Sequence, residues 1–131
     1  MIDYEINVFD RVYRKVSSLY AKGMFTSSYN PVPTAFPAGA LVELINRTDG
    51  KRQSSTPVEN FAVVVYQLDV YAMSKKEAKA VYGETDDAMI ALGFTRVSGD
   101  FLDNADDINI FRYTARYEAE IDRDGNIYRI T

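Results

Sequence analysis

Residues 61–72 (FAVVVYQLDVYA) contain no glycine or proline, and their side chains sort into two alternating sets. This period of two predicts a β-strand, because successive side chains of a strand point to opposite faces of a sheet. One set is apolar throughout and is expected in the core. The other set turns polar halfway and is expected to meet water or another protein towards its end. The first set is Ala62, Val64, Tyr66, Leu68, Val70 and Ala72, and the second is Phe61, Val63, Val65, Gln67, Asp69 and Tyr71.

Residues 74–93 predict a helix that follows this strand directly. Ser74 and Glu77 have the spacing of a capping box, in which each side chain bonds the backbone N–H of the other residue. Gly93 suits the left-handed residue that ends many helices. Gly83 costs about 1 kcal/mol relative to alanine inside a helix, so it marks a close approach of a neighbouring backbone, a kink, or a tolerated glycine. The apolar stripe is Ala78, Val81, Tyr82, Ala88, Met89 and Leu92.

Residues 2–22 predict a second amphipathic helix, with Asp3 as its N-cap and Gly23 at its end. Packing on a sheet is the expected use of its apolar side, and a membrane-surface helix is the alternative. That side is Ile2, Ile6, Phe9, Val12, Tyr13, Val16, Leu19 and Tyr20.

A long hairpin is expected before the strand at 61–72. Residues 24–39 hold three prolines and should cross the molecule as irregular but packed chain. Residues 40–46 predict a strand, and residues 46–57 are polar with an Asp-Gly turn signal, as at a hairpin tip. The tip carries three basic side chains, which suit either a solvated loop or a binding finger: Arg47, Lys51 and Arg52.

The last third of the chain predicts three strands. The acidic stretch between the first two lacks the spacing of an EF-hand, so a solvated loop is expected there rather than a calcium site. The elements are a short strand at 94–98, an acidic loop at 99–107, a long strand at 108–122, a turn at 123–126 and a final strand at 127–130. In the long strand, the apolar face is Phe111, Tyr113, Ala115, Tyr117, Ala119 and Ile121, and the other is Ile110, Arg112, Thr114, Arg116, Glu118 and Glu120.

These elements together predict an α+β fold in a single domain of residues 1–131. Its antiparallel sheet has two helices packed on one face and a long β-hairpin extension, because both helices and both long strands have only one apolar side to bury.

Composition argues against catalysis. The chain has no cysteine and no histidine, which excludes disulfides, thiolate chemistry, His-dependent triads and most zinc sites. No phosphate-binding glycine loop and no nucleophile–base pair is recognisable, so we expect no enzyme activity, no cofactor and no metal. No secretory signal is evident, and no apolar run approaches the ~20 residues of a membrane span.

Charge is unevenly distributed along the chain. Residues 61–131 carry eight basic and thirteen acidic side chains, a net charge of −5, whereas residues 1–60 carry seven basic and six acidic ones. This acidic second half disfavours a broad nucleic-acid-binding surface, which needs clustered lysine and arginine.

Several stretches resemble one known family. The chain passes from an amphipathic N-terminal helix to TAFPAG, then to VYQLDVYAMSKKEAKAV, GFTRVSGDFLDN and FRYTARYEAEID. This order is similar to the tail-terminator or tail-completion proteins of long-tailed bacteriophages, also called head-tail joining, neck or minor capsid proteins. The most specific part is Gln67 to Ala72 with Ser74 and Glu77, followed by Arg112-Tyr113 and Tyr117-Glu118.

The resemblance implies a structural role in the virion. Such proteins form a ring, commonly hexameric, at the head-proximal end of the tail tube. The ring ends tube polymerisation and gives the head connector a docking surface. The implied partners are other copies of the chain, the tail tube protein and the head-tail connector protein, in a particle assembled in the host cytoplasm. Genomic DNA would pass through the lumen without specific binding. The alternatives are a head-completion or connector adaptor ring protein, and a small ligand-binding α+β domain.

The strand alternation supplies the candidate interface, because the family brings no residue-level motif. The partly polar face of the sheet combines apolar residues with both signs of charge, which suits an interface core and rim. In a ring the contact is heterologous, so this face should meet an unlike surface, such as the hairpin or a sheet edge. An ordinary solvated face is the alternative. The candidates are Arg47, Lys51, Arg52, Gln67, Asp69, Arg112, Arg116 and Glu118.

Overall fold

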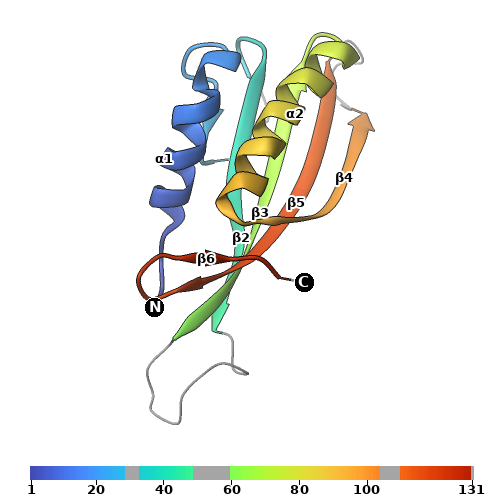
Figure 1. Ribbon diagram of the computed structural model, residues 1–131. Coiled ribbons are helices and arrows are strands. Elements are labelled where there is room, and N and C mark those ends of the chain that lie inside the picture. Colours follow the sequence, from blue (N-terminus) through green and yellow to red (C-terminus); the bar gives the residue numbers. More distant parts are fainter. Residues whose placement is uncertain (29–32, 49–59, 104–109, 131) are drawn as a thin grey trace.

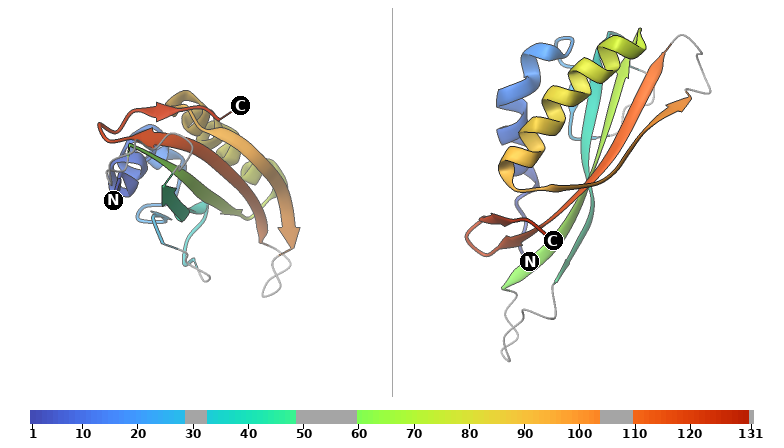
Figure 2. Two further views of the ribbon diagram at one scale, coloured as in Figure 1. Left: turned by 90° about the horizontal axis from the view of Figure 1, so that it is seen from below. Right: turned by 45° about the vertical axis from the view of Figure 1, so that its right-hand side comes forward.

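The computed structural model describes residues 1–28, 33–48, 60–103 and 110–130. Within these ranges, two α-helices lie side by side on one face of a curled sheet of six strands (Figures 1 and 2). In chain order the elements are α1 (Glu5–Val16), a 3-10 turn (Ser17–Leu19), β1 (Phe25–Thr26), β2 (Ala38–Thr48), β3 (Phe61–Ala72), α2 (Lys75–Leu92), β4 (Thr95–Asp103), β5 (Phe111–Asp122) and β6 (Ile127–Tyr128).

The α+β fold with both helices on one face is confirmed, but the sheet is mixed rather than purely antiparallel. The strand order is β1-β2-β3-β5-β4, and β6 pairs with β5. All these pairs are antiparallel except β1 with β2, where Phe25 lies opposite Gly39. A side chain on Gly39 would come within 2.6 Å of the Tyr20 ring, so this position needs glycine. The sequence did not predict β1, because a strand of two residues is too short to show an alternation of polar and apolar side chains.

β3 is the central strand, and its predicted core face is confirmed. Val64, Tyr66, Leu68 and Val70 are all buried beneath the two helices. On β5 the buried side chains of the same face are Ala115, Tyr117, Ala119 and Ile121, whereas Tyr113 is partly buried. Phe111 was predicted in the core and is exposed instead, because it begins β5 at the rim of the sheet.

α2 agrees closely with its prediction. The Ser74 hydroxyl accepts a hydrogen bond of 3.1 Å from the backbone N–H of Glu77, and Gly93 ends the helix with a φ of 114°. A side chain on Gly83 would meet open space, and the helix continues through it. The close-approach and kink interpretations of Gly83 are therefore wrong, and it is a tolerated glycine.

α1 is shorter than predicted and buries a narrower stripe. It begins at Glu5 and ends at Val16, and its buried residues are Val8, Val12 and Val16. Ile6, assigned to the apolar side, is 78% exposed, and Tyr13 is 42% exposed. The apolar residues span a wider arc than the sheet covers, so those at one edge of the arc stay outside the core.

β2 and β4 are longer than predicted, whereas β3 has the predicted bounds. β2 continues to Thr48, and the expected tip at 46–57 lies mostly in residues 49–59, outside the described part of the chain. β4 continues through Gly99 to Asp103, where the sequence predicted a loop, since Gly99 leaves room for the hydroxyls of Tyr82 and Tyr113. No helix in the described ranges is both long and apolar enough to cross a membrane.

Candidate partner-binding face

The face of the sheet opposite the helices, here called the open face, holds those predicted interface residues that lie in the described ranges. The register of β3 with β5 places Tyr71 opposite Arg112 and Gln67 opposite Arg116. Both helices lie on the other face of the sheet (Figure 2), and these side chains alternate with the core residues, so they belong to the face away from α1 and α2. The alternation therefore sorted these side chains correctly between the two faces of the sheet.

Asp69 is the centre of a hydrogen-bonded chain of side chains across the open face. The Arg112 guanidinium donates to Asp69 Oδ1 from Nε at 3.2 Å and from Nη2 at 3.0 Å. Gln67 Nε2 donates to Asp69 Oδ2 at 3.0 Å. Arg116 Nε in turn donates to Gln67 Oε1 at 3.3 Å. Four of the predicted interface residues are therefore brought together as one polar unit.

The burial of Asp69 differs from the prediction. Asp69 was predicted to meet water or a partner, but it is only 1% exposed, because Arg112 and Gln67 cover its carboxylate. The Arg112 guanidinium also lies 5.7 Å from the Tyr71 ring, which is buried as well. Asp69 thus positions Arg112 and Gln67, and those two residues form the surface that a partner can touch.

A shallow groove of about 280 Å³ lies beside this polar unit. Gln67, Asp69 and Arg112 form one wall, and Val42 and Leu44 of β2 form the other. A β-bulge between Glu43 and Ile45 places Leu44 outside the regular pairing. Leu44 is 44% exposed, so the β2 wall is apolar and accessible, and the neighbouring Ile45 is 47% exposed. The groove thus pairs an apolar wall with a charged one.

The other predicted interface residues are more dispersed. Glu118 is half-buried opposite Val65 on the open face, and Arg47 is exposed opposite Val63, further towards the hairpin. Lys51 and Arg52 lie outside the described residues. Sequence reasoning missed Val42, Leu44 and Ile45, because the bulge breaks the alternation from which they could have been found.

Asp3, Glu5 and Glu43 bring three carboxylates together near the start of α1. One oxygen from each lies within 4.8 Å of the others, a separation that could hold a metal ion. Burial, with smaller contributions from Glu5 and Asp3, raises the pKa of Glu43 to about 7. The Tyr66 hydroxyl also points at Glu43 Oε1, 3.5 Å away. At neutral pH Glu43 is therefore protonated in a substantial fraction of the folded molecules.

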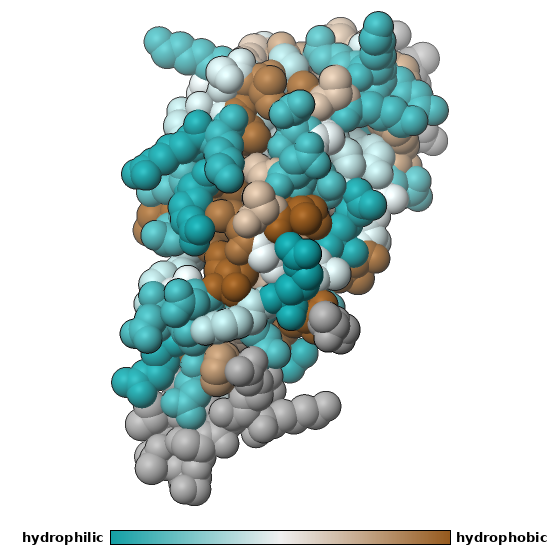
Figure 3. All heavy atoms as spheres, in the orientation of Figure 1, coloured by the Kyte–Doolittle hydropathy of each residue, from teal (hydrophilic) through white to brown (hydrophobic). Residues whose placement is uncertain are grey.

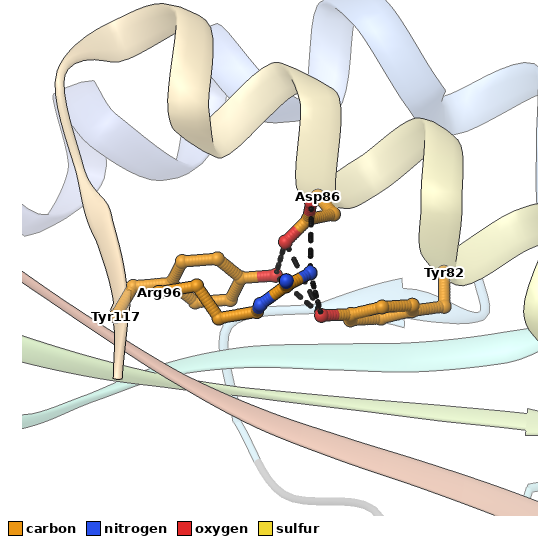
Figure 4. A network of polar contacts seen from close by, with 4 residues as sticks. All are labelled: Tyr82, Asp86, Arg96 and Tyr117. Atoms are coloured by element: carbon orange, nitrogen blue, oxygen red, sulfur yellow. Dashed lines mark hydrogen bonds and ion pairs between the residues drawn. The ribbon is translucent and has the colours of Figure 1, made fainter. Parts of the chain in front are cut away.

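A polar network of Tyr82, Asp86, Arg96 and Tyr117 connects α2 with the sheet (Figure 4). The Tyr117 hydroxyl donates to Asp86 Oδ1 at 2.6 Å, and the Tyr82 hydroxyl donates to the same oxygen at 3.2 Å. Arg96 Nη1 of β4 bonds Asp86 Oδ2 at 3.3 Å. Burial raises the pKa of Tyr117, so its hydroxyl stays protonated as a donor. The network fixes α2 to β4 and β5.

No protein-family model matches the chain, and no curated protein matches it. Among solved structures, the fold is shared with a chain in the virion of a native gene transfer agent (GTA) particle. The TM-score is 0.60 over 87% of this chain and 93% of that chain, at 14% sequence identity. At that identity the similarity shows the fold alone.

Proposed function

We propose that this chain is a structural protein of a phage-type virion and has no catalytic role. The observation that carries the proposal is the fold shared, over nearly the full length of both chains, with a chain of a gene transfer agent virion. The resemblance to tail-terminator proteins supports the same class independently of the structure.

Within that class, we propose a ring, of six subunits, at the head-proximal end of the tail tube. The ring ends tube polymerisation and offers the head connector a surface to dock on. The open face supports self-association, because its groove places exposed Leu44 beside Gln67 and Arg112, and Ile45 is also exposed next to Leu44. An apolar centre with a polar rim is the usual composition of a protein interface.

The decisive experiment is native mass spectrometry of the purified chain, with negative-stain microscopy of the same sample. We expect a closed ring of defined mass with a central opening. A chain that stays monomeric up to the concentrations used for microscopy would refute the ring. It would favour the alternative of a small ligand-binding domain.

A second experiment separates a tail terminator from a connector adaptor. The tail tube protein is polymerised with increasing amounts of this chain, and tube lengths are measured by microscopy. A terminator shortens the tubes and caps one end of each. A connector adaptor leaves tube length unchanged and co-purifies with the connector protein instead.

A further inference from the structure

The end of the molecule where α1 finishes and α2 begins gathers basic side chains. The two helices lie side by side and run in opposite directions, so the C-terminus of α1 and the N-terminus of α2 share one end (Figure 1). A hydrogen bond of 2.8 Å between the Tyr20 hydroxyl and Thr85 Oγ1 joins the chain after α1 to α2. Residues 10–24 and 75–81 carry only two acidic side chains, Asp10 and Glu77, in a chain whose net charge is −4. The same residues carry seven basic ones, here called the basic end: Arg11, Arg14, Lys15, Lys22, Lys75, Lys76 and Lys79.

The charges of the basic end are accessible. All seven side chains are exposed, and none forms an ion pair within the described ranges. Lys75 and Lys79 instead place their ammonium groups over the Phe101 ring, 5.1 Å and 5.8 Å from its centroid. Asp100, which precedes Phe101 on β4, alternates to the open face of the sheet. In the space-filling view, hydrophilic side chains project from this end of the molecule (Figure 3).

The lysines of α2 occupy positions that the helix itself disfavours. The N-terminus of a helix carries a partial positive charge, so acidic residues stabilise the first turn and cations destabilise it. Lys75 and Lys76 are the first two residues of α2, and Glu77 is the acidic residue of that turn. Arg14 and Lys15, by contrast, suit the last turn of α1. Residues whose placement opposes folding are expected where they serve a function, so the α2 lysines mark this end as a contact surface.

We propose that the basic end is a non-specific binding surface for the phosphate backbone of duplex DNA. Phosphate contacts need clustered lysine and arginine, and the fold assembles such a cluster from two segments that are distant in sequence. Five of the seven side chains are lysines, which are depleted in protein–protein interfaces, so a nucleic acid fits this surface better than an acidic protein does. Backbone contacts carry no sequence information, so any duplex can bind. This inference does not rest on the proposed ring.

The test is fluorescence anisotropy of a short labelled DNA duplex, titrated with the chain between about 50 and 200 mM salt. We expect the parent to bind, with a logarithm of affinity that falls linearly as the logarithm of salt concentration rises. The double substitution of Lys75→Gln with Lys76→Gln removes two positive charges from the α2 part of the basic end. The double substitution of Arg14→Gln with Lys15→Gln removes two from the α1 part. Each should reduce the salt slope by about two, because each lysine or arginine releases about one counterion.

The matched control removes the same charge beside the other end of α2. Arg123 lies in the exposed turn after β5, and Arg129 donates to the backbone oxygen of Ile90. The double substitution of Arg123→Gln with Arg129→Gln should therefore keep the salt slope of the parent. Failure of the parent to bind at low salt, or an equal fall of the slope in this control, would overturn the inference. Polyglutamate that displaces the duplex as readily as unlabelled DNA does would also overturn it, and would assign the surface to an acidic protein.

Urea unfolding separates lost binding from lost folding. The double variant of Lys75 and Lys76 should be at least as stable as the parent, because it takes two cations out of the first turn of α2. A variant that binds less DNA and is also less stable would mean that these lysines serve the fold, which would overturn their role in binding. A parent that is monomeric and binds DNA would refute the ring and leave this inference standing.

Discussion

Replacing Glu43 by glutamine should stabilise the folded chain, and the gain should grow as pH rises from about 4.5 to about 7. Glu43 is partly buried beside Asp3 and Glu5, and its pKa is raised from 4.5 to about 7. Glutamine keeps the size of the side chain and an oxygen that can accept from the Tyr66 hydroxyl, but it carries no charge. The substitution thus removes the cost of burying a charge and the smaller repulsion from Glu5 and Asp3, and it changes little else.

The sign follows from proton binding in the two states. Below about pH 4.5 the carboxyl is protonated whether the chain is folded or unfolded, so Glu43 costs nothing. Between that pH and about 7 the folded state still holds the proton whereas the unfolded state has lost it, and stability falls as pH rises. The full shift corresponds to about 3 kcal/mol, but contact with solvent reduces the expected cost to about 1–2 kcal/mol.

Urea unfolding measures this directly, at concentrations where native mass spectrometry finds the monomer. We expect Glu43→Gln to exceed the parent by about 1–2 kcal/mol at pH 8 and by much less at pH 5. Glu84→Gln, at an exposed position of α2, is the control and should track the parent at both values. Equal stability of Glu43→Gln and the parent at pH 8 would show that the charged Glu43 carboxylate costs the folded chain nothing, either through burial or through repulsion by Glu5 and Asp3.

Three further substitutions test the core, the polar network and the open face. Leu68→Ala should cost roughly 2–5 kcal/mol in urea unfolding, because Leu68 is fully buried, and a loss below about 0.5 kcal/mol would mean that the faces of β3 are reversed. Tyr117→Phe should cost about 1–3 kcal/mol by leaving a partly buried carboxylate short of a donor, while the control Tyr128→Phe, at an exposed hydroxyl, should cost under about 0.5 kcal/mol. If both substitutions lowered the free energy of unfolding equally, the network around Asp86 would not be a stabilising feature of the fold. Arg116→Glu should fold normally but form fewer rings in native mass spectrometry. The control Arg123→Glu, in the exposed turn, should form as many rings as the parent. Undiminished assembly of Arg116→Glu would mean that the open face is solvated.

The central strand and α2 were predictable because several local signals agree there. Alternation runs unbroken from residue 61 to residue 72, and Ser74 and Gly93 delimit the helix that follows. Agreement between local propensity, pattern and capping leaves little for tertiary contacts to override. The cross-strand pairing of Asp69 with Arg112 could also be expected, since both positions fall on the same face of neighbouring strands.

The features that were missed depend on contacts distant in sequence. β1 pairs with β2 through two residues, and this pairing depends on rings that fit over Gly39. The burial of Asp69 depends on the side chains that fold over it, which alternation does not report. The exposure of Ile6 depends on how far the sheet extends beneath α1. In each case the sequence shows an apolar or polar residue, and the tertiary packing decides how much of it is covered.

The bulge in β2 has a consequence for how this surface can diversify. Glu43 lies opposite Tyr66 and Ile45 lies opposite Val65, so Leu44 is one residue more than the ladder needs. Deleting its codon would leave every other pair of the hairpin in register and keep the core unchanged, while removing part of the groove wall. Deletion of this one codon can therefore change the shape of the groove while the register of the hairpin stays the same.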